Sequence, residues 1–383
     1  MDPEKKRLKS IISKHFNLEN IFIGVTILLG IIVIINIVLT HNLNQELKKS
    51  TEVIQEKLKP AKIELTIVQN SKCSDCFDIS TAVNHIKNAN VNISRESTVD
   101  FSSQEGKSLI KKYGLGKLPS VIIKGEIEKL AIQGLEKKGD ALIFSQISPP
   151  YTDASTGKTV GKVVLLHLKD PACEKCNDLT ALINQLRAAG VKIAEEKIIE
   201  PGSDEGKELI KKYNIDFAPT IILSQDAGSY ELIQQAWGQI GSRETDGAYV
   251  FRGGAAYPQF PSMNLTTGKL RGLVNIVYLA DKSCAECYDV NRHREILVQG
   301  FSVKLDKEEA YDISDAKGKE LAAKYNITKV PTVILSDEMG AYPSSQALRQ
   351  FFSVEKDNAY VFRQVQSVGT YKDLATGQVV KVE

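Results

Sequence analysis

Six cysteines are the residues of this chain best suited to chemistry, and their spacing indicates which chemistry. All six fall into three C-x-x-C pairs, and no cysteine is left over: Cys73/Cys76, Cys173/Cys176 and Cys284/Cys287. Two thiols at this spacing can close a local disulfide, share a metal ion, or exchange disulfides with other thiols. The five histidines all lie outside the C-x-x-C windows, which weakens a mixed Cys/His metal site.

Metal binding is the least favoured of these uses. A closed tetrahedral zinc site needs four ligands, and one pair supplies only two. We therefore predict no metal site, and the carriage of a soft ion such as copper(I) stays open as an alternative.

Each pair lies between an apolar run of strand length and a helix-like pattern. The runs begin at Lys62, Lys162 and Leu273. If the first cysteine ends the strand, its sulfur lies near the N-terminus of the helix, where free N–H groups favour a thiolate. The second cysteine then lies one turn along. Strand, C-x-x-C and helix together predict a site for dithiol exchange.

The surroundings of the cysteines repeat three times. A proline follows the first cysteine of each pair after 46 or 47 residues, at Pro119, Pro219 and Pro331. Further along come three similar turns, ASTGKTV, LTTGKLR and LATGQVV. We infer three tandem copies, each of domain size, with boundaries at 61–158, 159–268 and 269–383.

The order of elements in each copy predicts the fold class. A strand is followed by a helix, a second strand, a second helix and a strand that begins at the proline. Alternating strands and helices predict an α/β fold in which the first two strands are parallel and the crossover is right-handed.

Residues 21–39 carry no charge and match the apolar thickness of a bilayer. We predict a transmembrane helix over 21–40, after a cytoplasmic tail (1–20) and before a polar stalk (41–60). No A-x-A follows the apolar run, which disfavours a cleaved signal peptide. More lysines and arginines precede the helix than follow it, so the C-terminal domains are expected outside the cytoplasm. Sequons at Asn92, Asn264 and Asn326 permit that side.

The net charge is only +2, so no nucleic-acid partner is expected. No phosphate loop, Ser/His/Asp order or H-E-x-x-H motif is present, and no glycine-rich segment supports a flavin or nicotinamide site. We therefore expect no cofactor other than the redox-active disulfides.

From about residue 61 to 383 the chain resembles three thioredoxin-like domains, of the thioredoxin and protein disulfide isomerase superfamily. The resemblance implies that Cys73, Cys173 and Cys284 are nucleophiles and that Cys76, Cys176 and Cys287 resolve the mixed disulfide. It also implies cis-prolines at Pro119, Pro219 and Pro331, where the preceding backbone binds a client segment like an added strand.

The chain departs from that family at several positions. None of the three pairs is preceded by the common aromatic residue. Asp75, Glu174 and Glu286 place a carboxylate near each thiolate, which is expected to raise the thiol pKa. The family's buried proton-relay acid is replaced by Ile67, His167 or Tyr278, so that only His167 could relay protons; alternatively it merely fills a strand position. Asp78, Asp178 and Asp289 are expected to complement the helix dipole.

Two functions fit these features. The first is a membrane-tethered, extracytoplasmic thiol–disulfide oxidoreductase or isomerase. Its partners would be protein thiols and disulfides, and a membrane redox protein. The second is a non-catalytic scaffold of thioredoxin-like domains in which each C-x-x-C is a structural disulfide.

Overall fold

The computed structural model describes residues 18–254 and 257–382, so the predicted cytoplasmic tail lies outside the described residues up to residue 17. The chain forms two compact units. The first unit contains the chain up to Gln69, Asp78–Leu115 and Ser120–Gln146. The second contains Asn70–Phe77, Gly116–Pro119 and the chain from Ile147 onward. The first disulfide loop therefore belongs to the same unit as the second and third repeats.

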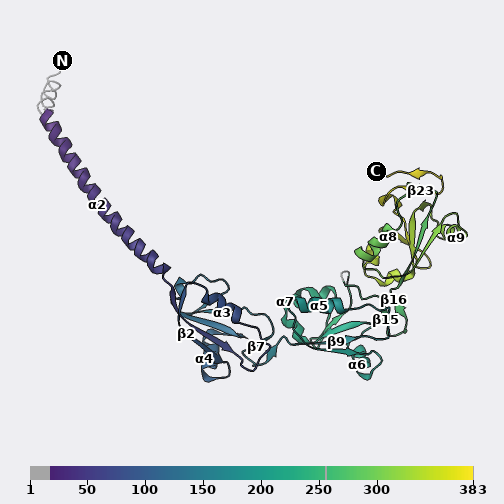
Figure 1. The fold of residues 1–383 in the computed structure, drawn as a ribbon, viewed down its shortest axis with the longest axis horizontal. Helices are drawn as coiled ribbons and strands as arrows, with labels where there is room; N and C mark the ends of the chain where they lie inside the picture. Colours follow the sequence, from purple (N-terminus) through teal and green to yellow (C-terminus); the bar gives the residue numbers. More distant parts are fainter. Residues whose placement is uncertain (1–17, 255–256, 383) are drawn as a thin grey trace, which may run out of the picture. The chain divides into compact units, whose positions relative to one another are not determined.

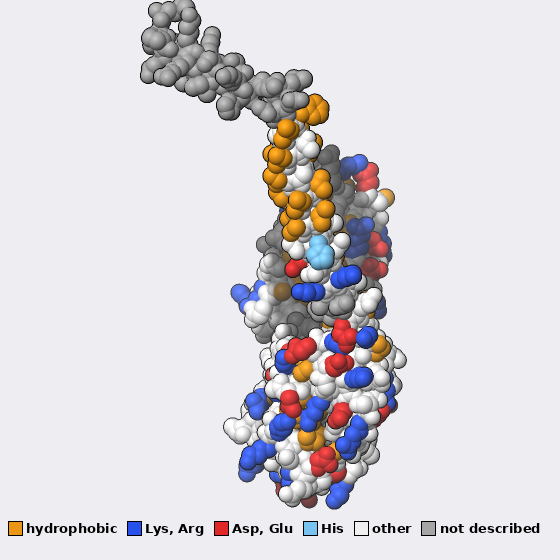
Figure 2. All heavy atoms as spheres, turned by 90° about the vertical axis from the view of Figure 1, so that its left-hand side faces the viewer, with side chains coloured by type: hydrophobic (Ala, Val, Ile, Leu, Met, Phe, Trp, Pro, Cys, Tyr) orange, Lys and Arg blue, Asp and Glu red, His pale blue; other side chains and the backbone are white. Residues whose placement is uncertain are grey.

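A single helix, α2 (Leu18–Leu58), contains the whole apolar segment. Among the described residues it is the one helix long and apolar enough to cross a bilayer. Its apolar side chains are exposed, and Figure 2 shows them gathered along the helix. The helix continues through the predicted stalk and ends two residues before Pro60, because a proline disfavours helical geometry in the residue before it. Such an N-terminal helix suits a membrane anchor or a signal sequence.

The first unit is built on a five-stranded sheet in the order β2-β1-β4-β6-β5. β1 is parallel to β2, and the other neighbours are antiparallel. Helices α3 (Ser80–Lys87) and α4 (Gln104–Tyr113) connect these strands (Figure 1). The strands are β1 (Ala61–Gln69), β2 (Val91–Asp100), β4 (Ser120–Gly125), β5 (Glu136–Lys138) and β6 (Ala141–Phe144).

The second unit contains two more sheets of the same topology, β10-β9-β12-β14-β13 and β18-β17-β20-β22-β21. In each, the first two strands are parallel. The strands of the second repeat are β9 (Val163–Leu168), β10 (Ile193–Ile199), β12 (Thr220–Leu223), β13 (Gly241–Arg243) and β14 (Tyr249–Phe251). Those of the third are β17 (Val274–Ala280), β18 (Leu305–Asp312), β20 (Thr332–Leu335), β21 (Phe352–Val354) and β22 (Tyr360–Phe362). The main helices are α5 (Thr180–Ala188), α6 (Asp204–Tyr213), α7 (Glu231–Ala236), α8 (Arg292–Glu295) and α9 (Ala316–Lys324).

Each repeat ends in a β-hairpin that belongs to a separate small sheet. In the first repeat, β7 (Tyr151–Asp153) and β8 (Thr159–Val160) form the hairpin, which pairs with the short strand β3 (Lys117–Leu118). The corresponding sets are β15 (Ser262–Asn264), β16 (Leu270–Arg271) and β11 (Phe217–Ala218), then β23 (Tyr371–Asp373), β24 (Val379–Val380) and β19 (Lys329–Val330). The second strand of the first hairpin, β8, lies beyond the predicted domain boundary at 158, and the second strand of the second hairpin, β16, lies beyond the one at 268.

The turn of each hairpin is shaped by its first polar residue. Asp153 accepts backbone N–H bonds from Ser155 (3.0 Å) and Thr156 (2.8 Å). Asn264 and Asp373 make the same bonds in their own turns. Glycine follows at positive φ in all three turns, where a side chain would strain the backbone: Gly157, Gly268 and Gly377. The three similar turns in the sequence are therefore hairpin turns.

Each repeat has its own apolar core. In the second repeat, Val163 and Leu165 of β9 pack with Leu182 and Leu186 of α5 and with Phe251 of β14. The third repeat builds the equivalent cluster from its own strands and helices. The prediction of an α/β fold with three repeated units containing parallel β–α–β segments, behind one apolar N-terminal helix, is confirmed.

Candidate functional site

Each C-x-x-C pair is closed as a disulfide in the loop between the first strand and the first helix of its repeat. All six cysteines are half-buried. In the first repeat, β1 ends at Gln69 and α3 begins only at Ser80, so both cysteines precede the helix. The other two helices begin similarly late, at Thr180 and Arg292. The prediction that the second cysteine lies one turn along the helix is wrong, which weakens the expected effect of the dipole on the thiolates.

A backbone hydrogen bond explains the late start of these helices. The N–H of the residue after the second cysteine donates to a carbonyl just ahead of the hairpin. The bonds are Phe77 to Pro150 (2.7 Å), Asn177 to Pro261 (2.7 Å) and Tyr288 to Thr370 (2.9 Å). This bond draws the chain toward the hairpin and delays the helix.

The recurring aspartates form the turn that follows. Asp78, Asp178 and Asp289 each accept the backbone N–H two residues on, at 2.9 Å in every repeat. The backbone bond from Ser80 lowers the pKa of Asp78, and the hydroxyl of Thr180 lowers that of Asp178. These carboxylates therefore organise the turn into the helix, and Asp178 also lines the pocket that Cys173 and Cys176 line.

The peptide bonds before Pro119, Pro219 and Pro331 are cis, as the resemblance implies. The second repeat brings Pro219 to a pocket of about 190 Å³ that Cys173 and Cys176 also line. The predicted proline and cysteines of that repeat therefore share one site.

The hairpin occupies the strand edge ahead of each of these prolines. Leu118 pairs with Thr152, Ala218 with Met263, and Val330 with Lys372, each in an antiparallel register. The residue just ahead of the hairpin thus binds the disulfide loop through one backbone hydrogen bond, and the hairpin strand pairs with the edge before the proline. The sequence pattern revealed the turns but did not connect them with the site.

Two hydroxyls of the hairpin approach the first disulfide. The Oγ1 of Thr152 lies 3.6 Å from the Cys76 sulfur, and the Oγ1 of Thr159 donates to the Cys73 sulfur at 3.6 Å. The side-chain amide of Asn70 donates a hydrogen bond to the Oγ1 of Thr152 (3.1 Å). Neither threonine was a predicted site residue, because each follows its cysteine by more than seventy positions in the sequence.

The second disulfide lies beside a buried histidine. His167 in β9 is 3% exposed, and its Nε2 has no hydrogen-bond partner within the described part of the chain. It lines the same pocket as Cys173 and Cys176. Burial lowers its pKa to about 4, so the ring is neutral at pH 7, and its type alone had suggested titration near neutral pH.

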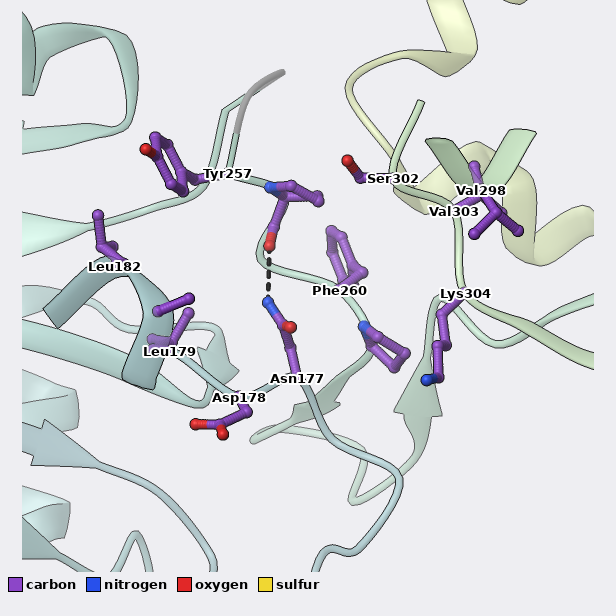
Figure 3. A pocket seen from close by; sticks show the side chains of 13 residues that line it. Asn177, Asp178, Leu179, Leu182, Tyr257, Phe260, Val298, Ser302, Val303 and Lys304 are labelled. Carbon is purple, nitrogen blue, oxygen red and sulfur yellow. Dashed lines mark hydrogen bonds between the residues drawn. The ribbon is translucent and has the colours of Figure 1, made fainter. Parts of the chain in front are cut away.

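Asn177, which follows Cys176, is also bound to the segment ahead of the hairpin. Its side-chain amide donates to the Pro258 carbonyl at 2.8 Å, as Figure 3 shows. This second bond fixes the loop to the chain between β14 and β15. The adjoining pocket in Figure 3 is also lined by Phe260 and by Val303 and Lys304 of the third repeat.

The third repeat fills the equivalent space with aromatic rings. Tyr288, which follows Cys287, is buried, and its hydroxyl donates to the Pro331 carbonyl at 2.6 Å. The same hydroxyl lies 3.0 Å from Nε2 of His293, which is 3% exposed. Burial raises the pKa of Tyr288 and lowers that of His293 to about 4. At the relay position, Tyr278 donates to Glu308 at 2.7 Å and does not serve the disulfide.

Two of the three carboxylates between the cysteines are paired with a lysine. Asp75 pairs with Lys162 (2.9 Å) and Glu286 with Lys381 (2.9 Å), and each lysine lies just after the hairpin of the same repeat. The Lys162 ammonium lowers the pKa of Asp75. Because this cation offsets the carboxylate, the expected rise in thiol pKa is smaller at the first site.

Within the described residues, no cluster of three or more His, Cys, Asp or Glu side chains is placed to hold a metal ion. The cysteines are engaged in disulfides, so no described cysteine is free to act as a ligand. The arrangement suits sulfur exchange.

Comparison with known proteins gives neither a matching family model nor a matching curated protein. Among solved structures, the chain is similar to the alkylhydroperoxide reductase component AhpF of Enterococcus faecalis, with 21% identity over 46% of this chain and 81% of that one, at a TM-score of 0.15. It is similar to zinc-bound human ERp44, with 12% identity over 79% and 89% of the two chains and a TM-score of 0.14. A protein disulfide oxidoreductase from Aeropyrum pernix K1 shows 19% identity over 46% and 77%, at 0.14.

These similarities are low, and the class of protein follows from the chain's own geometry. Each repeat has a mixed sheet with parallel first strands, a C-x-x-C disulfide after the first strand, and a cis-proline ahead of the third. The three repeats therefore have a thioredoxin-like fold.

Proposed function

We propose that the chain is a membrane-tethered thiol–disulfide oxidoreductase or isomerase that acts on protein thiols and disulfides outside the cytoplasm. One observation carries the proposal. Three C-x-x-C disulfides are half-buried rather than enclosed, and at least the second lines a pocket together with its proline. A disulfide that only braced a fold would gain nothing from such a pocket.

The second repeat gives the clearest exchange step. A client thiolate attacks the Cys173 sulfur, the Cys173–Cys176 bond breaks, and Cys176 leaves as a thiolate. A second client thiolate then attacks the client sulfur of the mixed disulfide and releases Cys173. The client is oxidised by two electrons and the repeat is reduced by two. The reverse sequence reduces a client disulfide, with Cys173 attacking and Cys176 resolving.

His167 supports this step as a proton relay. Its neutral ring lines the pocket, and its buried Nε2 has no hydrogen-bond partner among the described residues. Departure of Cys176 as a thiolate creates charge in a partly buried site, and proton transfer through the neutral imidazole would reduce that charge. No residue of this type stands at the corresponding positions, Ile67 and Tyr278.

The remaining parts of the proposal concern location and electrons. Helix α2 would anchor the chain with its N-terminus in the cytoplasm and the repeats outside, where disulfides persist. A sustained reaction needs a partner that restores the disulfides or the thiols. A membrane redox protein is one such partner, and client disulfides serve the purpose in isomerisation.

A non-catalytic scaffold is the second candidate, and one observation favours it. The hairpins occupy the strand edge before Pro119, Pro219 and Pro331, where a client segment would pair. If the hairpins never leave, the three disulfides are structural and the domains present only their outer surfaces.

A redox titration of the full chain in detergent micelles distinguishes these functions, with thiol trapping and mass spectrometry resolving each pair. Exchange sites should titrate between roughly −120 and −270 mV and equilibrate within minutes. Potentials below about −300 mV at all three pairs, or resistance to reduction until the domains unfold, would assign the chain to the scaffold class. Cys176→Ser should also trap mixed disulfides through Cys173, and Cys173→Ser is the matched control that should not trap them there.

A further inference from the structure

The edge that a client segment would need is filled by the chain itself in every repeat. Leu118, Ala218 and Val330 directly precede the three prolines, and each pairs with the first strand of its own hairpin. Backbone groups that already pair with one strand cannot pair with another. An extended client segment can therefore add to this edge only after the hairpin has left it.

The hairpin also restrains the disulfide loop. The residue after each second cysteine donates its N–H to Pro150, Pro261 or Thr370, one residue before the hairpin begins. The residue that leads into the hairpin therefore contacts the loop, and the hairpin strand pairs with the edge before the proline two residues later. If the hairpin and the residue ahead of it left together, the disulfide loop and the strand edge before the proline would both become free to bind a client.

These hairpins are short enough to be displaced. Each pairs with the edge over two residues only, and each turn spans five residues, most of which are exposed. A two-stranded hairpin of this size is marginally stable by itself in water. Its hold on the site therefore depends on the few contacts it makes there.

We propose that each hairpin is a displaceable internal strand that occupies the position of the client and thereby regulates access to its disulfide. This inference rests on the proposed exchange function and adds its regulation. The occupant that replaces the hairpin is an extended, unfolded protein segment that carries a cysteine. Exchange then proceeds as written above, so the hairpin changes the rate of access and takes no part in the transfer of electrons.

The side-chain contacts between each hairpin region and its disulfide loop rank the three sites by how firmly the hairpin is held. In the first repeat, Thr152 and Thr159 contact both sulfurs, and Lys162 pairs with Asp75. In the third, Lys372 bonds to Asp281 and to Ser283 (3.2 Å), while Lys381 pairs with Glu286.

The second repeat lacks such links from the hairpin itself, although Asn177 of its loop bonds to the Pro258 carbonyl ahead of the hairpin. No side chain of Ser262–Arg271 hydrogen-bonds or ion-pairs with the loop Asp170–Asn177, and both segments lie wholly within the described residues. Met263 takes the place of Thr152, and Arg271 pairs instead with Glu338 at 2.9 Å. The second hairpin should therefore open most readily and the second disulfide should exchange fastest.

The test uses the full chain in detergent micelles and one glycine change in the second hairpin. Gly268 has φ +66° with open space around it, so Gly268→Val strains the turn without a clash. Gly190 has φ +87° with the same open space but lies after α5, outside the hairpin, so Gly190→Val is the matched control. The probe is an unstructured peptide with one cysteine, and alkylation with mass spectrometry measures the rate of opening at each disulfide.

Gly268→Val should speed the reaction of Cys173–Cys176 by about fivefold or more, the factor expected from placing a branched residue in left-handed backbone. Gly190→Val should leave that rate within about twofold, and neither change should alter the other two disulfides. In the unmodified chain, the second disulfide should react first. Met263→Thr/Leu270→Thr, which gives the second hairpin the residues of the first, should slow it.

The outcomes separate this inference from the proposed function. If the unmodified chain exchanges but Gly268→Val matches Gly190→Val while hydrogen exchange shows an opened hairpin, the regulation by the hairpin is overturned and the exchange function stands. Equal rates at all three sites, with no slowing by the threonine pair, would also overturn it. If every variant is inert until urea unfolds it, both proposals fail. An inert unmodified chain that Gly268→Val activates supports the hairpin as a closed gate.

Discussion

The second and third repeats build the same disulfide loop but surround it with different side chains. The second places a neutral His167, whose Nε2 has no partner in the part of the chain that the structure describes, in a pocket that Cys173 and Cys176 also line. The third buries Tyr288 against Pro331 and His293, and its hairpin is tied to the loop by two lysines. The comparison teaches that one backbone arrangement can hold either an accessible sulfur pair or a braced one. Which of the two results is decided by a few residues around the loop.

The largest expected effect is on the stability of the third repeat, where Tyr288 packs against Pro331 and His293. Tyr288→Ala removes a buried ring and two hydrogen bonds and should cost that repeat about 3–5 kcal/mol. Asn177→Ala, its counterpart, loses a side-chain bond to Pro258 and should cost about 1 kcal/mol. Hydrogen exchange of β17 and β9 under urea measures each repeat separately. Equal losses of stability in the two repeats would contradict the proposed difference between the tightly packed third site and the second site with its pocket.

Acid should destabilise the second and third repeats. The folded pKa of His167 and of His293 is about 4, below the ordinary value of 6.5. As pH falls below 6.5, the unfolded state binds the proton first. Stability present above pH 6.5 is therefore lost progressively down to pH 4, by roughly 3 kcal/mol per histidine.

The first repeat supplies the control for this pH dependence, since it buries no histidine in its described residues. Its hydrogen exchange should change less between pH 6.5 and 4 than that of the other two repeats, after correction for intrinsic exchange. His293→Phe should remove most of the acid loss in the third repeat alone. Acid loss of the same size in the first repeat would show that these histidines are not its cause.

His167 also sharpens the comparison kinetically. If it relays protons, His167→Leu should slow exchange at Cys173–Cys176 about tenfold near neutral pH and change its pH profile. Rates at the other two disulfides should stay the same. His167→Gln, which keeps a polar group in the strand, should not restore the rate. A change in stability without a change in the pH profile would indicate that the histidine only fills its strand position.

The smallest effect is expected from the ion pairs beside the cysteines. Lys381 and Glu286 are largely exposed, and water and salt screen such pairs. Lys381→Ala should change the rate at Cys284–Cys287 by less than about twofold at physiological salt, in the direction of faster opening. Stopped-flow measurements at low and high salt should show the difference shrinking as salt rises. A large, salt-independent effect would mean that the lysine holds the hairpin by more than charge.

Much of the fold could be predicted from the sequence because it depends on local patterns. The apolar runs before Cys73, Cys173 and Cys284 are strands, the helix-like patterns that follow contain helices, and the run at 21–39 lies in one long helix. Three repetitions of the same order made each assignment more certain than one copy would. The prolines at 119, 219 and 331 fall at the expected strand edge for the same reason.

What covers each disulfide was decided only by the tertiary structure. Thr152 and Thr159 reach the first disulfide from more than seventy residues away, and the sequence shows only that a TGK or TGQ turn recurs there. The burial that makes His167 neutral, and the contact between Tyr288 and Pro331, likewise depend on distant strands packing over them. Residue types and spacing determine which groups can react. Long-range pairing determines which of them a client can reach, because only the folded chain brings the hairpin back to the edge beside the sulfurs.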